Sequence, residues 1–164
     1  MMKNVINLFA LLLPILVLTS CSSDAESVES TAVETAKTYT HNTTELELLD
    51  LVNAYRVENG LNALQIIQHI SYKSEEHNNY MIATNTVSHD NFSSRKTNLE
   101  QVVGAVRVGE NVAYGFSTPQ ATLNAWIASE GHRVNLLGNY THFGLSIREN
   151  ADGRKYYTNI FVKK

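Results

Sequence analysis

Three short stretches of the sequence carry side chains that could bind a metal ion or move protons. Each lies beside a turn-forming or helix-ending signal, and they are residues 88–92 (SHDNF), 109–113 (GENVA) and 129–137 (SEGHRVNLL). Their imidazole and carboxylate groups come from His89, Glu110 and His132. Glycine next to Glu110 and next to His132 lets the backbone bend, so we expect both side chains to lie where elements end. Because histidine titrates near neutrality and a neighbouring carboxylate fixes its tautomer, the three groups together would form a metal-binding or acid/base site.

Each of these residues also has a structural interpretation when it is taken alone. His89 could be a surface histidine beside a capping aspartate, Glu110 could be a turn carboxylate that accepts hydrogen bonds from backbone N–H groups, and His132 could stabilise the end of the preceding helix. His77 and His142 have no motif partner, which favours packed or surface positions for them. The sequence shows neither a nucleophile-elbow serine nor an HExxH helix, so it offers no independent reaction signature.

The order of these motifs resembles a known family. His89, the GEN triplet at 109–111, Trp126 and the GHRVNLL segment at 131–137 follow one another as in the CAP superfamily, the cysteine-rich secretory, antigen 5 and pathogenesis-related 1 proteins, also called the SCP domain. Residues 53–64 resemble the first helix and turn of that domain, and the resemblance extends from about residue 45 to residue 164 in the bacterial form of the family. It implies an α-β-α sandwich and agrees with the elements that the residue patterns predict.

The resemblance also implies a cleft lined by two histidines and two glutamates. Three of them correspond to His89, Glu110 and His132. The second family glutamate falls three residues after Trp126, where this chain has Ser129, so Glu130 is the nearest substitute and the match to the family's set is incomplete here. We therefore predict a site of His89, Glu110, Glu130 and His132, with His89 and His132 as the candidate ligands of a Zn²⁺ ion and no certain cofactor.

The first 20 residues have the pattern of an export signal. Lys3 supplies the positive start, and residues 8–18 form an apolar run that is too short to cross a bilayer comfortably. The run ends in LTSC, which resembles the bacterial lipoprotein box and predicts that Cys21 is acylated and anchors the chain to a membrane. An ordinary secretory signal with an incidental cysteine is the alternative. Because Cys21 is the only cysteine, no disulfide can stabilise the domain, unlike in the animal and plant members of the family.

Residues 21–43 are rich in Ser, Thr, Ala and Glu and predict an acylated cysteine followed by a flexible tether. The domain is then expected to span residues 44–164. The formal net charge is −3 and no basic stripe is present, which argues against nucleic acid as a partner. We expect a cell-envelope, extracytoplasmic protein, either periplasmic or on the outer surface.

The apolar spacing after residue 43 predicts helices first and strands later. Helical periods cover residues 44–58, 66–84, 97–103 and 117–131. The period then changes to alternation, and residues 143–147 and 156–161 flank a turn at 150–153, which predicts a β-hairpin. The second strand is apolar on both faces, so we expect it to lie centrally with helices on either side. These elements predict an α+β layered sandwich, in agreement with the three-layer α-β-α sandwich that the resemblance implies.

Three function classes stay open. The first is a ligand-binding or interaction module whose His/Glu cleft takes a small molecule, lipid or glycan. The second is a metal-assisted hydrolase, in which His89 and His132 hold Zn²⁺ and Glu110 serves as base for a bound water. The third is a structural envelope lipoprotein. Fold-level similarity alone cannot select an activity, so whether the protein is an enzyme is left open.

Overall fold

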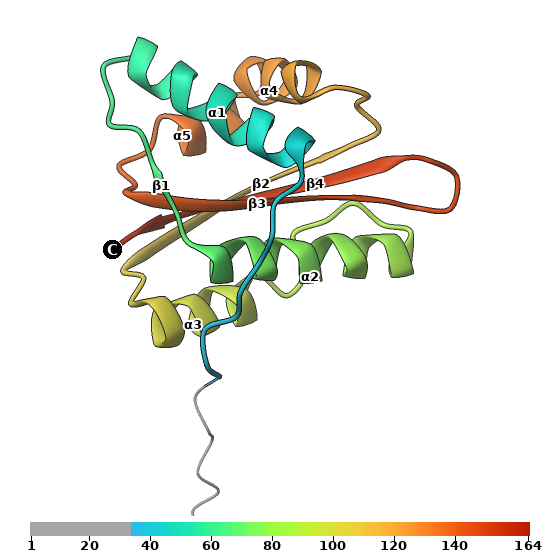
Figure 1. Ribbon diagram of the computed structural model, residues 1–164, viewed down its shortest axis with the longest axis horizontal. Coiled ribbons are helices and arrows are strands. Elements are labelled where there is room, and N and C mark those ends of the chain that lie inside the picture. Colours follow the sequence, from blue (N-terminus) through green and yellow to red (C-terminus); the bar gives the residue numbers. More distant parts are fainter. Residues whose placement is uncertain (1–33) are drawn as a thin grey trace, which may run out of the picture. The chain divides into compact units, whose positions relative to one another are not determined.

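Four strands form one mixed sheet between two layers of helices, as Figure 1 shows. The computed structural model describes residues 34–164, so the predicted leader, Cys21 and the first part of the predicted tether lie outside the described residues. The elements are α1 (Thr43–Glu58), β1 (Gln65–Ile66), α2 (Gln68–Thr84), α3 (Phe92–Val103), β2 (Arg107–Tyr114), α4 (Pro119–Ala128), α5 (Glu130–Leu136), β3 (His142–Glu149) and β4 (Lys155–Lys163). Among the helices of residues 34–164, none is both long enough and apolar enough to span a membrane.

The strand order is β1-β3-β4-β2, which makes β4 an inner strand although it comes last in the sequence. β3 and β4 form the predicted antiparallel hairpin, and β2 pairs antiparallel with the other side of β4. β1 is only two residues long and pairs parallel with the start of β3. The outer strands are therefore β1 with the uncovered part of β3 on one side, and β2 on the other.

Alternate residues of β4 face the two helical layers. Tyr157 and Phe161 pack into the core under α1, α4 and α5, whereas Ile160 and Val162 pack against α2 and α3. All four side chains are fully buried. The predicted α+β class and three-layer α-β-α sandwich are therefore confirmed, and so is the inner position of the second hairpin strand.

Helix α1 begins one residue before its predicted start, because Asn42 caps it. The Asn42 side chain accepts a hydrogen bond from the Glu45 amide, and the Glu45 side chain accepts one from the Asn42 amide, which forms a capping box. The helix ends at Asn59, as predicted. The predicted helix at 117–131 is divided in two, since Ser129 adopts an extended conformation between α4 and α5.

Two segments differ from the sequence expectations in kind or extent. Residues 107–114 form β2, whereas the GEN triplet was expected in a turn. Helix α3 begins at Phe92, five residues earlier than predicted, because the polar start of this helix hides its period. Where α2 crosses β3, a Cβ atom on Gly144 would lie 2.3 Å from the backbone nitrogen of Ser71, so only glycine allows the helix to approach this closely.

The packed region begins before residue 44. Residues 34–42, which we call the strap, lie on the domain and belong to the same compact unit. Tyr39 in the strap is only 7% exposed. The predicted tether, residues 21–43, therefore includes a segment that packs on the domain. The composition of the tether is polar throughout, so the single buried aromatic residue gave too weak a signal to identify the start of packing.

Candidate functional site

Glu110 lies in the middle of β2, with its carboxylate on the side of α2 and α3. The expectation that it sits at the end of an element is therefore wrong, because residues 107–114 continue as a strand on both sides of it. Gly109 serves a different purpose from a turn. A Cβ atom there would lie 2.4 Å from the hydroxyl oxygen of Tyr140, so glycine permits close packing at this point of the strand.

The Glu110 carboxylate is held by a fork of hydrogen bonds from Arg95 in α3. Arg95 Nε donates to Glu110 Oε2 and Arg95 Nη2 donates to Glu110 Oε1, both at 2.8 Å. His89 Nδ1 lies 2.8 Å from Glu110 Oε1. Burial opposes ionisation of Glu110, but the hydrogen bonds from His89 and Arg95 and the charge of Arg95 outweigh it and keep the pKa of Glu110 below its usual value. Glu110 is therefore an ionised and fully engaged carboxylate.

His89 lies on the loop between α2 and α3, and three contacts fix this loop. His77 Nε2 lies 2.8 Å from the carbonyl oxygen of Ser88, and Arg95 Nη1 donates to the carbonyl oxygen of Asp90 at 2.7 Å. Tyr80 also donates its hydroxyl proton to the Asp90 carboxylate at 2.9 Å. The loop thus holds the His89 ring against Glu110, while 51% of the His89 side chain stays exposed.

His77 is a member of this cluster that the sequence reasoning missed. Its side chain is fully buried, and its Nε2 lies 3.8 Å from Glu110 Oε1. Burial lowers the pKa of His77, against the opposing charge of Glu110, so the ring is neutral at pH 7. Its Nδ1 has no hydrogen-bond partner among the described residues.

Arg95 was missed as well, although its helix carries a usable signal. The buried residues of α3 are Arg95, Leu99 and Val103, which places one charge on an otherwise apolar stripe. His77 lies likewise on the buried face of α2 together with Ile70 and Met81. A charged or titratable group on a buried stripe needs a partner, and a search for such groups would have found both residues.

His132 approaches from the opposite helical layer, in the first turn of α5 and not at a bend. Asn111 faces this layer and donates its side-chain N–H to the carbonyl oxygen of His132 at 3.0 Å. Asn135 donates to the carbonyl oxygen of Glu110 at 3.1 Å and to the Asn111 side chain at 2.9 Å. These amides attach α5 to β2. Burial lowers the pKa of His132, and the nearby charge of His89 lowers it further.

The last predicted member of the site, Glu130, is exposed at the start of α5. Its carboxylate makes no hydrogen bond or ion pair with the described residues, in contrast to Glu110. Across residues 34–164, no group of three or more His, Cys, Asp or Glu side chains is arranged to hold a metal ion. The described donors therefore do not fit a three-ligand zinc site, because Glu110 is held by Arg95 and Glu130 is exposed without a partner among the described residues. The proposed Zn²⁺ ligation by His89 and His132 stays a prediction.

A cavity of about 320 Å³ adjoins the cluster. Its lining residues come from the His89 loop, from α3, from β2 and from α5, and they are His89, Phe92, Val108, Gly109, Glu110 and Asn135. The walls are mainly apolar, and the Glu110 charge inside is balanced by Arg95. The geometry thus combines an apolar pocket with a half-exposed imidazole whose orientation a buried carboxylate fixes.

The three-layer sandwich, with a glutamate on its outer strand β2 paired to a histidine of the loop between α2 and α3, defines a class of domain, and comparison with known proteins identifies the class. Residues 49–162 match the family described as CAP, the Cysteine-rich secretory protein family. The chain therefore belongs to the CAP family, as its motifs predicted.

Relatives and solved structures agree with this assignment. The chain is 37% identical over 126 residues to the uncharacterized membrane protein YlbC of Bacillus subtilis, a match that covers 74% of this chain and 35% of that protein. An extracellular SCP-domain protein of Bacillus anthracis is similar with 31% identity and a TM-score of 0.65, over 74% of this chain and 40% of that one. An outer surface protein of Borrelia burgdorferi shares the fold, with a TM-score of 0.68 and 18% identity, over 76% of this chain and 96% of that one. The chain thus spans well under half of the length of the first two proteins.

Proposed function

We propose that the protein is an envelope-anchored, extracytoplasmic CAP domain that binds a ligand in the cavity beside His89. The observation that carries the proposal is the pairing of His89 Nδ1 with Glu110 Oε1 at 2.8 Å, next to a cavity of about 320 Å³. An ionised carboxylate accepts hydrogen bonds only, so Nδ1 of His89 carries the proton. In neutral His89 the exposed nitrogen, Nε2, is then a hydrogen-bond acceptor available to a ligand.

The charges in the cavity favour an uncharged ligand. Glu110 and Arg95 neutralise each other through two hydrogen bonds, so neither charge is free to pair with a ligand. Asn135 uses its side-chain N–H groups on Glu110 and Asn111, and its oxygen accepts from the Tyr140 hydroxyl at 3.4 Å and has one further lone pair. Phe92 and Val108 supply apolar walls. A neutral molecule with hydroxyl groups and an apolar face, such as a glycan unit or a lipid with a neutral headgroup, fits these features.

The envelope location is supported by the leader-like residues 1–20 and by the LTSC sequence that ends at Cys21. It is also consistent with two similar proteins, of which one is named as a membrane protein and the other as an extracellular protein. Mass spectrometry of the mature N-terminus tests the anchor. A diacylated or triacylated Cys21 is expected, and a free thiol or cleavage at another residue would contradict it.

The hydrolase alternative gains no support from the described geometry. A base for a metal-bound water needs a free carboxylate with an ordinary or raised pKa, whereas Glu110 is held by Arg95 and its pKa is lowered. Calorimetric titration with Zn²⁺ still distinguishes the two functions. Tight zinc binding that is lost in both His89→Ala and His132→Ala, together with hydrolysis of peptide or ester substrates, would favour the enzyme.

The binding proposal is tested by nuclear magnetic resonance with two neutral probes, N-acetylglucosamine and monoacylglycerol in micelles. We expect at least one probe to shift the signals of His89 and Phe92 in a saturable manner, and His89→Ala to weaken binding about tenfold, the effect of one lost hydrogen bond. His142→Ala is the matched control, because His142 lies on β3 and does not line the cavity. Equal binding by both variants would contradict the proposed role of His89.

A further inference from the structure

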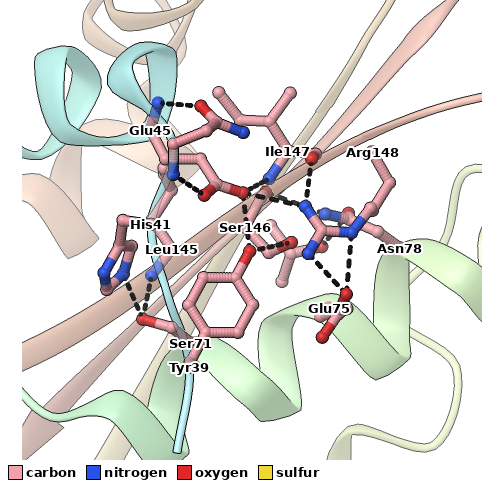
Figure 2. A network of polar contacts seen from close by, with 12 residues as sticks. Tyr39, His41, Glu45, Ser71, Glu75, Asn78, Leu145, Ser146, Ile147 and Arg148 are labelled. Atoms are coloured by element: carbon pink, nitrogen blue, oxygen red, sulfur yellow. Dashed lines mark hydrogen bonds and ion pairs between the residues drawn. The ribbon is translucent and has the colours of Figure 1, made fainter.

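The strap, residues 34–42, is attached to the domain by contacts that depend on two histidines. Tyr39 is its buried anchor and donates its hydroxyl proton to Glu45 Oε1 at 2.6 Å. Figure 2 shows this ring beside Glu45, with His41 next to Ser71 of α2. The chain on either side of Tyr39 has much less apolar contact, so its position depends on polar contacts.

His69 in α2 holds the first half of the strap, residues 34–38. The backbone N–H of Lys37 donates to His69 Nδ1 at 3.0 Å, and His69 Nε2 lies 2.8 Å from the side-chain oxygen of Asn98 in α3. Asn98 donates its own N–H to the Glu34 carboxylate at 2.7 Å, which fixes the orientation of the amide. These partners require the neutral ring with the proton on Nε2.

Protonation of His69 is incompatible with this arrangement. The imidazolium ion has N–H donors on both nitrogens, so a proton on Nδ1 would face the Lys37 N–H at 3.0 Å. Only 1% of His69 is exposed, so water cannot replace the lost acceptor unless the strap moves. The backbone of the strap must therefore leave α2 when the ring takes up a proton.

The charges around His69 come from the strap and from α2. Glu34 on the strap favours the imidazolium ion, but it already pairs with Lys73 of α2 at 3.5 Å and with Asn98. Tyr72 of α2 stacks near the His69 ring with centroids 6.1 Å apart, and α3 contributes the uncharged Asn98. Lys73 also pairs with Glu76 of α2, so its one positive charge is shared between two carboxylates. The hydrogen-bond pattern, and not a net charge, decides the protonation state that the closed strap permits.

His41 joins the other end of the strap to α2. Its Nε2 lies 2.8 Å from Ser71 Oγ, which also accepts a hydrogen bond from the backbone N–H of Leu145. Burial lowers the pKa of His41, against the opposing charge of Glu45 on α1. A histidine with a lowered pKa in the closed state contributes its stability fully above pH 6.5, and this contribution is lost as the pH falls from there through the lowered pKa of the closed state.

We propose that the strap is an acid-released latch: residues 34–38 leave α2 and α3 when His69 is protonated, while the sheet stays folded. Release frees residues 34–38, which span about 16 Å at full extension. It also uncovers His69 and Asn98 between α2 and α3. The device therefore alters the surface that the domain presents when the medium becomes acidic.

Hydrogen–deuterium exchange of the full chain at pH 7.5 and pH 5.0 tests the latch, with rates corrected for the intrinsic effect of pH. We expect exchange at Lys37 and its neighbours to become about tenfold faster at pH 5.0 in the wild type, while β4 stays protected. In His69→Asn the change should be less than about twofold, because the asparagine oxygen can accept the Lys37 N–H bond and does not titrate. His142→Asn is the matched control and should behave as the wild type.

Several outcomes overturn the proposal. They are unchanged protection of the strap in the wild type, an equal change in His69→Asn, and loss of β4 protection at pH 5.0, which would mean global unfolding. If His69→Asn is unfolded at pH 7.5, a wild-type titration by nuclear magnetic resonance decides. The Lys37 amide and the His69 ring must then titrate with one shared midpoint, and two different midpoints overturn the latch.

Discussion

Two buried glutamates lie at opposite edges of the sheet, and each forms an ion pair with an arginine. Glu45 lies beside β3 and pairs with Arg148, whereas Glu110 lies on β2 and pairs with Arg95. Each side chain is about 1% exposed. The difference is in the other partners and in what lies next to each carboxylate.

The Glu45 network is closed by the protein itself, as Figure 2 shows. Its carboxylate accepts hydrogen bonds from two backbone amides, those of Asn42 at 2.9 Å and Ile147 at 2.8 Å, as well as from Tyr39 and Arg148. Arg148 is further fixed by Glu75 of α2. The Glu45 carboxylate thus completes the cap of α1 through Asn42, accepts a hydrogen bond from the backbone N–H of Ile147 at the edge of β3, and holds Tyr39 of the strap.

The Glu110 network is open on one side. Its donors are two side chains, Arg95 and the half-exposed His89, and the cavity of about 320 Å³ lies beside them. The comparison teaches that a buried ion pair does not by itself mark a functional site. A cavity of about 240 Å³ also borders the Glu45 network at Ile147 and Arg148, but Glu45 does not line it. Glu110 and the half-exposed His89 do line the cavity beside them, and this distinguishes the site from the structural network.

The largest effect is expected for Glu45→Gln. The amide group would place N–H donors against backbone amides that cannot turn away, and it would leave Arg148 with Glu75 as its only remaining carboxylate. We expect the free energy of unfolding to fall by about 3–5 kcal/mol, measured by urea denaturation. A loss below about 1 kcal/mol would show that the network is dispensable.

Glu110→Gln should be less destabilising. Water in the adjoining cavity can solvate Arg95 and His89, so we expect a loss of about 1–3 kcal/mol in the free energy of unfolding. Ligand binding should nevertheless be lost, because the glutamine cannot hold the His89 proton on Nδ1 as firmly as the carboxylate does. Glu45→Gln, studied at low denaturant, is the control that separates folding from binding. The distinction between the two networks fails if Glu110→Gln is the more destabilised variant and binds normally.

The smallest effect is expected from lowering the pH, which removes the contribution of ionised Glu110 to the stability of the fold. The pKa of Glu110 in the folded protein lies below the value of 4.5 that it has in the unfolded chain. The carboxylate therefore contributes its stability fully above pH 4.5, and this contribution disappears as the pH falls through the lowered folded value. The difference in unfolding free energy between the wild type and Glu110→Gln should shrink when urea denaturation is repeated from pH 5 down to pH 3. A constant difference over this range would contradict the lowered pKa.

Much of the fold could be predicted, because its elements carry local signals. The alternation at 143–147 and 156–161 and the turn between them gave the hairpin, and the helical period of Leu48, Leu49 and Val52 gave α1. Strand β2 was missed, since GEN contains two residues that favour turns and the strand is completed by pairing with β4, which is distant in sequence. Tyr39 was missed for the same reason, because its partners Glu45 and Ser146 define its burial.

In the candidate site, the sequence motifs identified His89 and Glu110 but not Arg95 and His77, which lie beside them. His89 and Glu110 were predicted together, and the structure brings them into contact. Nothing local marks Arg95 as the partner of Glu110, because the pairing depends on how α3 packs against β2. Glu130 shows the converse problem, since nearness in sequence to a family position did not bring its side chain to Glu110.

The position of β4 has a consequence for how the chain becomes folded. The strand occupies residues 155–163, yet it lies between β3 and β2 and pairs with both. These two strands therefore cannot be joined in one sheet before β4 is available. Ile147 and Glu45, which close the strap network, are 102 residues apart. Contacts of such long range form slowly, since a large loop must close first. A nascent chain that still lacks residues 155–163 therefore cannot complete the native sheet. The native fold of the domain is therefore reached only after nearly all of residues 34–164 have been synthesised.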